Sequence, residues 1–144
     1  MQPVVNEAFR HFMAHEFAEG KMLLWMDAEA YEKIPFDNVE KLARAIAIYE
    51  HYIAEGAPHK INLDEPTLDD LRMKFSEGNR KKLTPHRLTK VFNLVFGKVF
   101  QELKFNFLPR FLCSKGAFTC SSTINNVVVT VCLCFAFAAK ILPY

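Results

Sequence analysis

Histidine and carboxylate side chains near the start of the chain are the first residues whose types and spacing could hold a metal ion. His11 and His15 are four residues apart, so on a helix they would share one face, with Glu16 beside them. The sequence places no third ligand near this pair, and we interpret the two histidines as surface polar residues. We therefore expect no metal site and no cofactor.

Cysteine is the other residue type that could carry chemistry, and all four cysteines lie in the last third of the chain: Cys113, Cys120, Cys132 and Cys134. They form no C-x-x-C pair, and no second cluster could complete a zinc site. Residues 1–6 lack the charged start and apolar run of a secretory signal, which favours free thiols in a reducing, cytoplasmic setting. No catalytic site is evident, so we predict a protein that is not itself an enzyme.

Charge is distributed unevenly along the chain. Up to residue 70 there are 14 acidic and 6 basic side chains, and from residue 71 onward 2 acidic and 12 basic ones. The bases are scattered except for Arg80-Lys81-Lys82, which we interpret as a solvated loop. Contact of this run with phosphate or with a lipid surface is the alternative interpretation. We expect no nucleic-acid partner.

The elements that must position any functional residue are helices. With 144 residues, 51% of them hydrophobic and 14 of them phenylalanine, the chain can bury one core as a single globular domain. Apolar residues at helical spacing over residues 9–17, ending at Phe17, predict a first helix behind Asn6 as N-cap, which Gly20 weakens or ends. A second helix should end near Lys33, because Pro35 disfavours the helical conformation in the residue before it.

Further capping signals mark the following helices. Asp37 with Glu40 three residues later predicts an N-terminus for a helix that carries an apolar stripe to residue 53. Thr67 with Asp70 opens a shorter helix, and residues 76–82 read as a polar exposed loop.

The second half is predicted to contain one long buried helix. Thr84-Pro85 is expected to start it, with proline at its favoured first position. Residues 88–103 then follow the i, i+3, i+4, i+7 template, and Pro109 starts another short segment. We place the helical domain at residues 1–118. Residues 119–144 form an apolar tail whose structure the sequence leaves open, with membrane contact through the tail as one alternative.

Three motifs in this order resemble the regulator of G-protein signalling (RGS) family: FRHFMAHEFAE at residues 9–19, IYEHYIAEGAP followed by INLD at 48–58 and 61–64, and LPRFLCS at 108–114. The resemblance covers residues 7 to about 116. It implies an all-α, two-lobed helical bundle that binds the switch regions of a Gα subunit. Such a partner speeds GTP hydrolysis by positioning groups of the GTPase, without contributing a catalytic group.

The resemblance also implies a set of Gα-binding positions. Asn62 matches the family asparagine that reaches the switch glutamine, and its amide can donate and accept together. Glu19 matches the first acid of the loop between the first two helices, and Arg110 matches the arginine of the final signature. Asn62 as a turn or cap residue, Glu19 as a solvated acid and Arg110 as a partner of a helix end are the purely structural alternatives.

The chain departs from the family pattern at several of these positions. Gly20 and Lys21 stand where a second glutamate and an asparagine are usual, and Asn106 stands where an aspartate is common, which loses charge-assisted strength. Phe96 replaces a glutamine, and the loop at residues 78–82 looks inserted. A diverged scaffold that keeps the fold for other protein partners is therefore the alternative to a GTPase-activating regulator. A location at the inner face of the plasma membrane and the oligomeric state stay open.

Overall fold

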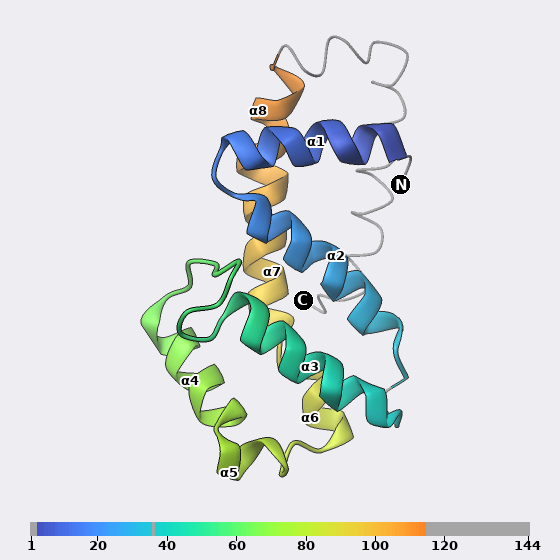
Figure 1. Cartoon of the computed structure of the whole chain (residues 1–144), viewed down its shortest axis with the longest axis vertical. Helices are drawn as coiled ribbons and strands as arrows, with labels where there is room; N and C mark the ends of the chain where they lie inside the picture. The colour runs from blue at the N-terminus through green and yellow to red at the C-terminus, as the bar shows by residue number, and fades with distance from the viewer. Residues whose placement is uncertain (1–2, 36, 115–144) are drawn as a thin grey trace. The chain divides into compact units, whose positions relative to one another are not determined.

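The computed structural model describes residues 3–35 and 37–114, and all regular structure within them is helical (Figure 1). The all-α fold class is therefore confirmed. The helices are α1 (Pro3–His15), α2 (Glu19–Lys33), α3 (Val39–Tyr52), α4 (Glu65–Phe75), α5 (Glu77–Arg80), α6 (Pro85–Lys90), α7 (Asn93–Glu102), the π-helix η1 (Leu103–Phe107) and α8 (Leu108–Leu112). The predicted boundary at residue 118 and the tail lie outside the described residues.

The described chain divides into two compact units. Residues 3–22 and 97–114 make one, which we call the terminal unit, and residues 23–96 make the other, which we call the central unit. The boundaries fall inside α2 and α7, so each of these helices contributes residues to both units. Each unit is described below by itself.

Aromatic side chains hold the terminal unit together. Phe111 of α8 lies 5.2 Å from the ring of Phe9 and 5.5 Å from the ring of Phe12, measured between centroids. Met13 and Phe107 belong to a second buried cluster that borders the same two α1 phenylalanines. These edge-on and tilted contacts are the geometries that aromatic pairs prefer. The final motif is thus attached to α1 through its own phenylalanine.

Both ends of α1 differ from the sequence-based expectation. Asn6 lies inside α1 rather than capping it, because the helix begins at Pro3. The predicted stripe also ends early, since α1 stops at His15 and Phe17 is 99% exposed. The first helix thus ends before Gly20, and Gly20 lies in the first turn of α2.

Stacked rings likewise organise the central unit. Phe75 at the end of α4 stacks on Tyr49 of α3, with centroids 4.7 Å apart, and on Phe92, with centroids 5.5 Å apart. Tyr31 of α2 donates its hydroxyl proton to the carbonyl oxygen of Leu88 in α6. Burial and the neighbouring charge of Glu32 raise the pKa of Tyr31, so this hydroxyl stays a donor. These contacts connect α2, α3, α4 and α6.

Local capping explains where the central helices begin, and two predicted caps shift. Asn38, not Asp37, caps α3, because its side chain accepts from the backbone N–H of Glu40 at 2.9 Å. Asp64, not Thr67, caps α4 and accepts from the N–H of Thr67 at 3.2 Å. The predicted type of side-chain cap is therefore present at both helices. The capping residue lies one position later than predicted at α3 and three positions earlier at α4.

The second half of the chain is more broken than predicted. The expected loop at 76–82 contains the short helix α5, and the expected long helix is divided into α6, α7 and η1. Thr84 does cap α6, accepting from the N–H of Arg87 at 3.4 Å, with Pro85 in the first turn, which confirms that start. The buried stripe continues across the break through Val91 and Phe92.

Candidate Gα-binding site

Asn62 is the residue that the family motif marks most strongly, and the structure presents it on a fixed loop between α3 and α4. The N–H of Ile61 donates to the carbonyl oxygen of Tyr52 at 2.9 Å, and the Ile61 side chain is buried. On the other side, Asp64 is fixed by capping α4. Asn62 lies between these two anchors with an exposed side chain.

The capping alternative for Asn62 is not what the structure shows. Asp64 accepts from both the N–H and the hydroxyl of Thr67, at 3.2 and 2.7 Å. The Asn62 amide makes no side-chain hydrogen bond to any residue within 3–35 and 37–114. Its donor and its acceptor are therefore available to a partner, as the family role would require.

Phe17 is a prominent surface residue of the terminal unit that sequence reasoning placed on a buried stripe. The N–H of Ala18 donates to the carbonyl oxygen of Met13 at 2.9 Å, and the N–H of Phe17 donates to that of Ala14 at 3.1 Å. This is the Schellman arrangement, in which the residue after the cap takes the left-handed conformation. Phe17 has φ of 54° and fills the position that glycine usually occupies.

The consequence is an aromatic ring in solvent on a strained backbone. A non-glycine residue in this region costs roughly 1–2 kcal/mol. Ala18, whose side chain is buried next to Met13, takes the apolar role predicted for Phe17. The exposure of Phe17 follows from the left-handed turn at this residue. The helical spacing of residues 9–17 predicts the opposite, a buried side chain.

The charged candidates of the terminal unit are all held in ion pairs. Glu19 accepts from Nε of Arg10 at 2.7 Å. Arg110 pairs with the carboxylate of Glu16 and also lies over the ring of Phe107, 5.9 Å from its centroid. Arg110 thus pairs with a residue that directly follows the end of α1. Such exposed pairs contribute about 0–1 kcal/mol each, so a partner can compete for them.

Lys21 behaves differently from the other candidates. Its side chain is only 19% exposed, its ammonium pairs with Glu102 at the end of α7, and it lies 5.4 Å from the ring centroid of Phe107. The cation that replaces the usual asparagine is therefore directed into the terminal unit. Gly20 beside it contributes no side chain.

Asn106 lies in η1, a stretch of π-helix that the apolar periodicity does not predict. The N–H of Leu108 donates to the carbonyl oxygen of Leu103, five residues earlier. Pro109 follows directly and supplies no N–H to the preceding turn. In this wider turn Phe107 is buried while Asn106 and Phe105 are exposed. Short π segments occur frequently at functional sites.

The predicted site residues fall into both units. Glu19, Gly20, Lys21, Asn106 and Arg110 lie in the terminal unit, whereas Asn62 lies in the central unit. Within the described residues, no three His, Cys, Asp or Glu side chains are grouped to hold a metal ion. No helix in this described part of the chain is long and apolar enough to cross a bilayer.

Comparison with known proteins assigns the family. The model of the regulator of G protein signaling domain matches residues 1–116. The chain belongs to the RGS family. It is 32% identical over 108 residues to regulator of G-protein signaling 8 of Danio rerio, covering 75% of this chain and 56% of that protein. It is 31% identical over 108 residues to regulator of G-protein signaling 5 of Rattus norvegicus, covering 75% and 54%.

A longer relative shows the same region in another setting. Regulator of G-protein signaling 7 of Homo sapiens is 30% identical over 114 residues, which is 79% of this chain but 21% of that protein. The RGS chain described here spans about half the length of the first two relatives. The family assignment thus concerns the RGS domain at residues 1–116, not the full length of these relatives.

Proposed function

We propose that this domain binds Gα subunits and accelerates their GTP hydrolysis by stabilising the switch regions, with no catalytic group of its own. Asn62 carries the proposal. It is exposed, its amide has no side-chain hydrogen bond within the described residues, and the bonds at Ile61 and Asp64 fix the loop on either side. A side chain held before binding loses little further freedom when it meets its partner.

The reaction itself explains why one amide can matter. Little covalent chemistry is needed in phosphoryl transfer, and the GTPase supplies both the water-orienting glutamine and the charge-stabilising groups. A partner that holds the glutamine in its reactive orientation lowers the barrier through positioning. Asn62 can donate to the glutamine carbonyl oxygen and accept from its amide.

The terminal unit carries the other proposed Gα contacts. Glu19, Asn106 and Arg110 offer polar groups, and Phe17 offers an exposed ring whose strained backbone has no evident structural benefit. Strain that persists at an exposed residue is a reason to look for function there. We place Phe17 in the Gα contact for this reason.

One observation favours the alternative of a diverged scaffold that binds other proteins. The ammonium of Lys21 pairs with Glu102, and Gly20 offers no side chain, so two family contact positions present little to a partner. In that case Asn62 would have no role in GTP hydrolysis.

Single-turnover GTP hydrolysis by a panel of purified Gα subunits, with and without this chain, tests the proposal. We expect acceleration that falls by about 10²-fold in Asn62→Ala, as for loss of one preorganised hydrogen-bond donor. Lys60→Ala is the matched control, because Lys60 is an exposed residue two positions away in the same loop. If the wild-type chain accelerates hydrolysis by none of the Gα subunits, the scaffold alternative is favoured. The same holds if Asn62→Ala accelerates hydrolysis as much as wild type does.

A further inference from the structure

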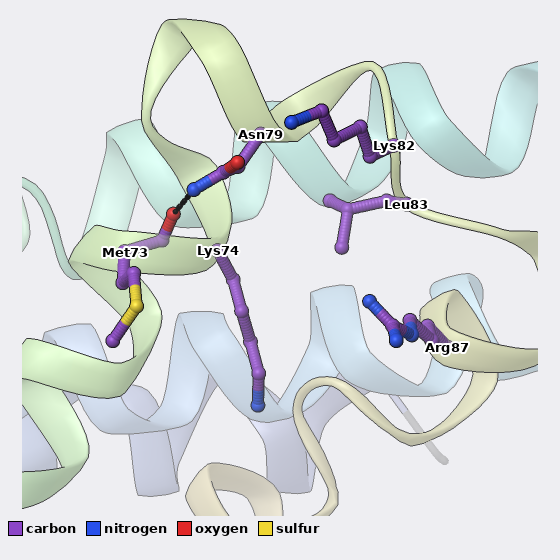
Figure 2. A pocket seen from close by; sticks show the side chains of 6 residues that line it. All are labelled: Met73, Lys74, Asn79, Lys82, Leu83 and Arg87. Carbon is purple, nitrogen blue, oxygen red and sulfur yellow. Dashed lines mark hydrogen bonds between the residues drawn. The ribbon is translucent and has the colours of Figure 1, made fainter.

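A basic pocket lies within the central unit, where residues 73–87 turn back on themselves. It has a volume of about 220 Å³ and is lined by Met73 and Lys74 of α4, Asn79 of α5, Lys82 and Leu83 of the following turn, and Arg87 of α6 (Figure 2). None of these is a proposed Gα contact. The pocket therefore needs an explanation of its own.

Local hydrogen bonds fix the walls of this pocket. The side-chain amide of Asn79 donates to the carbonyl oxygen of Met73 at 3.0 Å, as Figure 2 shows. Ser76 donates its hydroxyl to the same carbonyl oxygen at 2.9 Å. On the opposite side, Thr84 caps α6 and sets the start of the helix that carries Arg87. The lining residues are thus attached to a defined frame rather than to a featureless loop.

The charges of the lining are all of one sign. Lys74, Lys82 and Arg87 line the pocket, and no acidic residue does. Lys74 pairs with Asp70 on its own helix at 2.5 Å. The side chains of Lys82 and Arg87 make no ion pair or hydrogen bond with any residue in the part of the chain that the structure describes. Two uncompensated cations at one hollow create a positive potential that favours an anion.

The size and composition of the pocket suit a phosphate group. Pockets for drug-sized ligands begin at about 300 Å³, so this one fits a smaller group. Guanidinium binds phosphate oxygens through two parallel N–H donors, and lysine adds a point charge. Met73 and Leu83 give the lining apolar surface for the carbon skeleton that carries the phosphate.

We propose that this pocket binds a phosphate monoester, with Arg87 and Lys82 contacting the phosphate oxygens. The site is separate from the proposed GTPase-activating function and needs no Gα subunit. The surrounding segment supports capture of an anion, since residues 73–90 hold six lysines and arginines against one acid, Glu77. Two of those bases, Arg80 and Lys81, do not line the pocket.

Lys81 provides the decisive control. It is exposed and adjacent to Lys82 in the same basic run, so Lys81→Gln and Lys82→Gln change the net charge equally. A pocket distinguishes the two variants, whereas a diffuse basic surface does not. Arg87→Gln tests the second predicted ligand from another segment.

The full chain should be titrated with inositol 1,4,5-trisphosphate while chemical shifts of Asn79 and Arg87 are followed by NMR. We expect saturable shifts, and a Kd that rises at least ~3-fold in Lys82→Gln or Arg87→Gln, ~10-fold in the double variant and less than ~2-fold in Lys81→Gln, because the lost bonds are charge-assisted. No saturable binding, or an equal effect of Lys81→Gln and Lys82→Gln, would overturn the proposal.

A second arm identifies the source of the phosphate. Phosphatidylcholine vesicles with and without phosphatidylinositol 4,5-bisphosphate should be compared in sedimentation with the chain. Retention that the soluble trisphosphate displaces and that needs Arg87 assigns the pocket to a lipid head group. Binding of the soluble probe without vesicle retention assigns it to a free phosphate ester. Retention that is the same in the double variant and wild type shows membrane attachment through other residues and contradicts a lipid-binding pocket.

Discussion

The backbone N–H of Ala18 lies 2.9 Å from the carbonyl oxygen of Met13, and the turn that this bond closes holds Phe17 in the left-handed conformation. Glycine would fit this position without strain. The chain instead carries a ring that is 99% exposed and contributes no burial. Glycine would therefore suit the fold at this position, whereas the phenylalanine present suits the proposed Gα partner.

Phe17→Gly should stabilise the domain and weaken Gα binding. Relief of the left-handed strain is expected to raise the free energy of unfolding by about 1 kcal/mol, measured by urea denaturation. Loss of the exposed ring should lower affinity for a Gα subunit loaded with GDP and aluminium fluoride. Phe17→Ala is the control, because it removes the ring but retains the strain, and should lose affinity without gaining stability. Unchanged affinity in both variants would remove Phe17 from the proposed contact.

The two departures at positions 20 and 21 should have separable effects. Gly20→Glu adds an acid in the first turn of α2, which favours the helix by up to about 1 kcal/mol and restores the acid that the family pattern has at this proposed Gα contact. We expect tighter Gα binding from this change. Lys21→Asn loses the pair with Glu102 and the contact with Phe107, which should cost on the order of 1 kcal/mol of stability.

Surface plasmon resonance and thermal unfolding on both single variants and the double variant give the comparison. Gly20→Ala controls for the loss of glycine flexibility alone. If neither Gly20→Glu nor the double variant binds Gα more tightly than wild type, the start of α2 is not part of the contact.

Lys41 gives a test of the central unit. Its side chain is 2% exposed, and its ammonium donates to the carbonyl oxygens of Ile34 at 3.0 Å and Tyr31 at 3.1 Å. It also lies 4.4 Å from the centroid of the Tyr31 ring. Pro35 prevents α2 from continuing, so a lysine from α3 donates to the Ile34 carbonyl and shares the Tyr31 carbonyl with the backbone N–H of Ile34.

Lys41→Met should therefore lower the free energy of unfolding by about 1–3 kcal/mol, because the aliphatic stem is kept but the part-buried Ile34 carbonyl loses this donor. Chemical denaturation followed by circular dichroism measures this. Lys33→Met, at an exposed position of α2, should change stability by less than about 0.5 kcal/mol. Equal stability of the two variants would contradict the capping role of Lys41.

Residues whose partners are close in sequence were predictable, and those with distant partners were not. Thr84-Pro85 carries its whole capping geometry within three residues, so the start of α6 follows from the sequence. Lys21 and Glu102 are 81 positions apart, and no local sequence pattern predicts the ion pair between them. The π register before Pro109 is missed because apolar periodicity assumes 3.6 residues per turn.

The same distinction applies to the candidate site. The family motif identified Asn62, whose exposure then follows from the anchors at Ile61 and Asp64. The helical spacing predicts a buried Phe17 because it counts apolar residues without regard to where the helix stops, whereas the side chain is exposed. Two hydrogen bonds at the end of α1 override the stripe.

Glu32 should make stability depend on pH in the acidic range. Its Oε1 is buried without a hydrogen-bond partner among the described residues, and burial raises the pKa of Glu32, with the charge of Lys41 opposing the shift. The folded state therefore binds this proton more tightly than the unfolded chain, whose carboxyl has the ordinary value of 4.5. The stabilising contribution is fully present below that value and is lost as the pH rises through the folded-state pKa.

Glu32→Gln keeps the shape but has no proton to lose. The variant should gain stability relative to wild type as the pH is raised from 4 through the folded-state pKa, and the difference should then level off. Urea denaturation at half-unit steps between pH 4 and 7 measures this difference. Glu40→Gln, at an exposed position of α3, is the control and should show no comparable rise. A flat profile for Glu32→Gln would mean that the buried carboxyl is hydrated in solution.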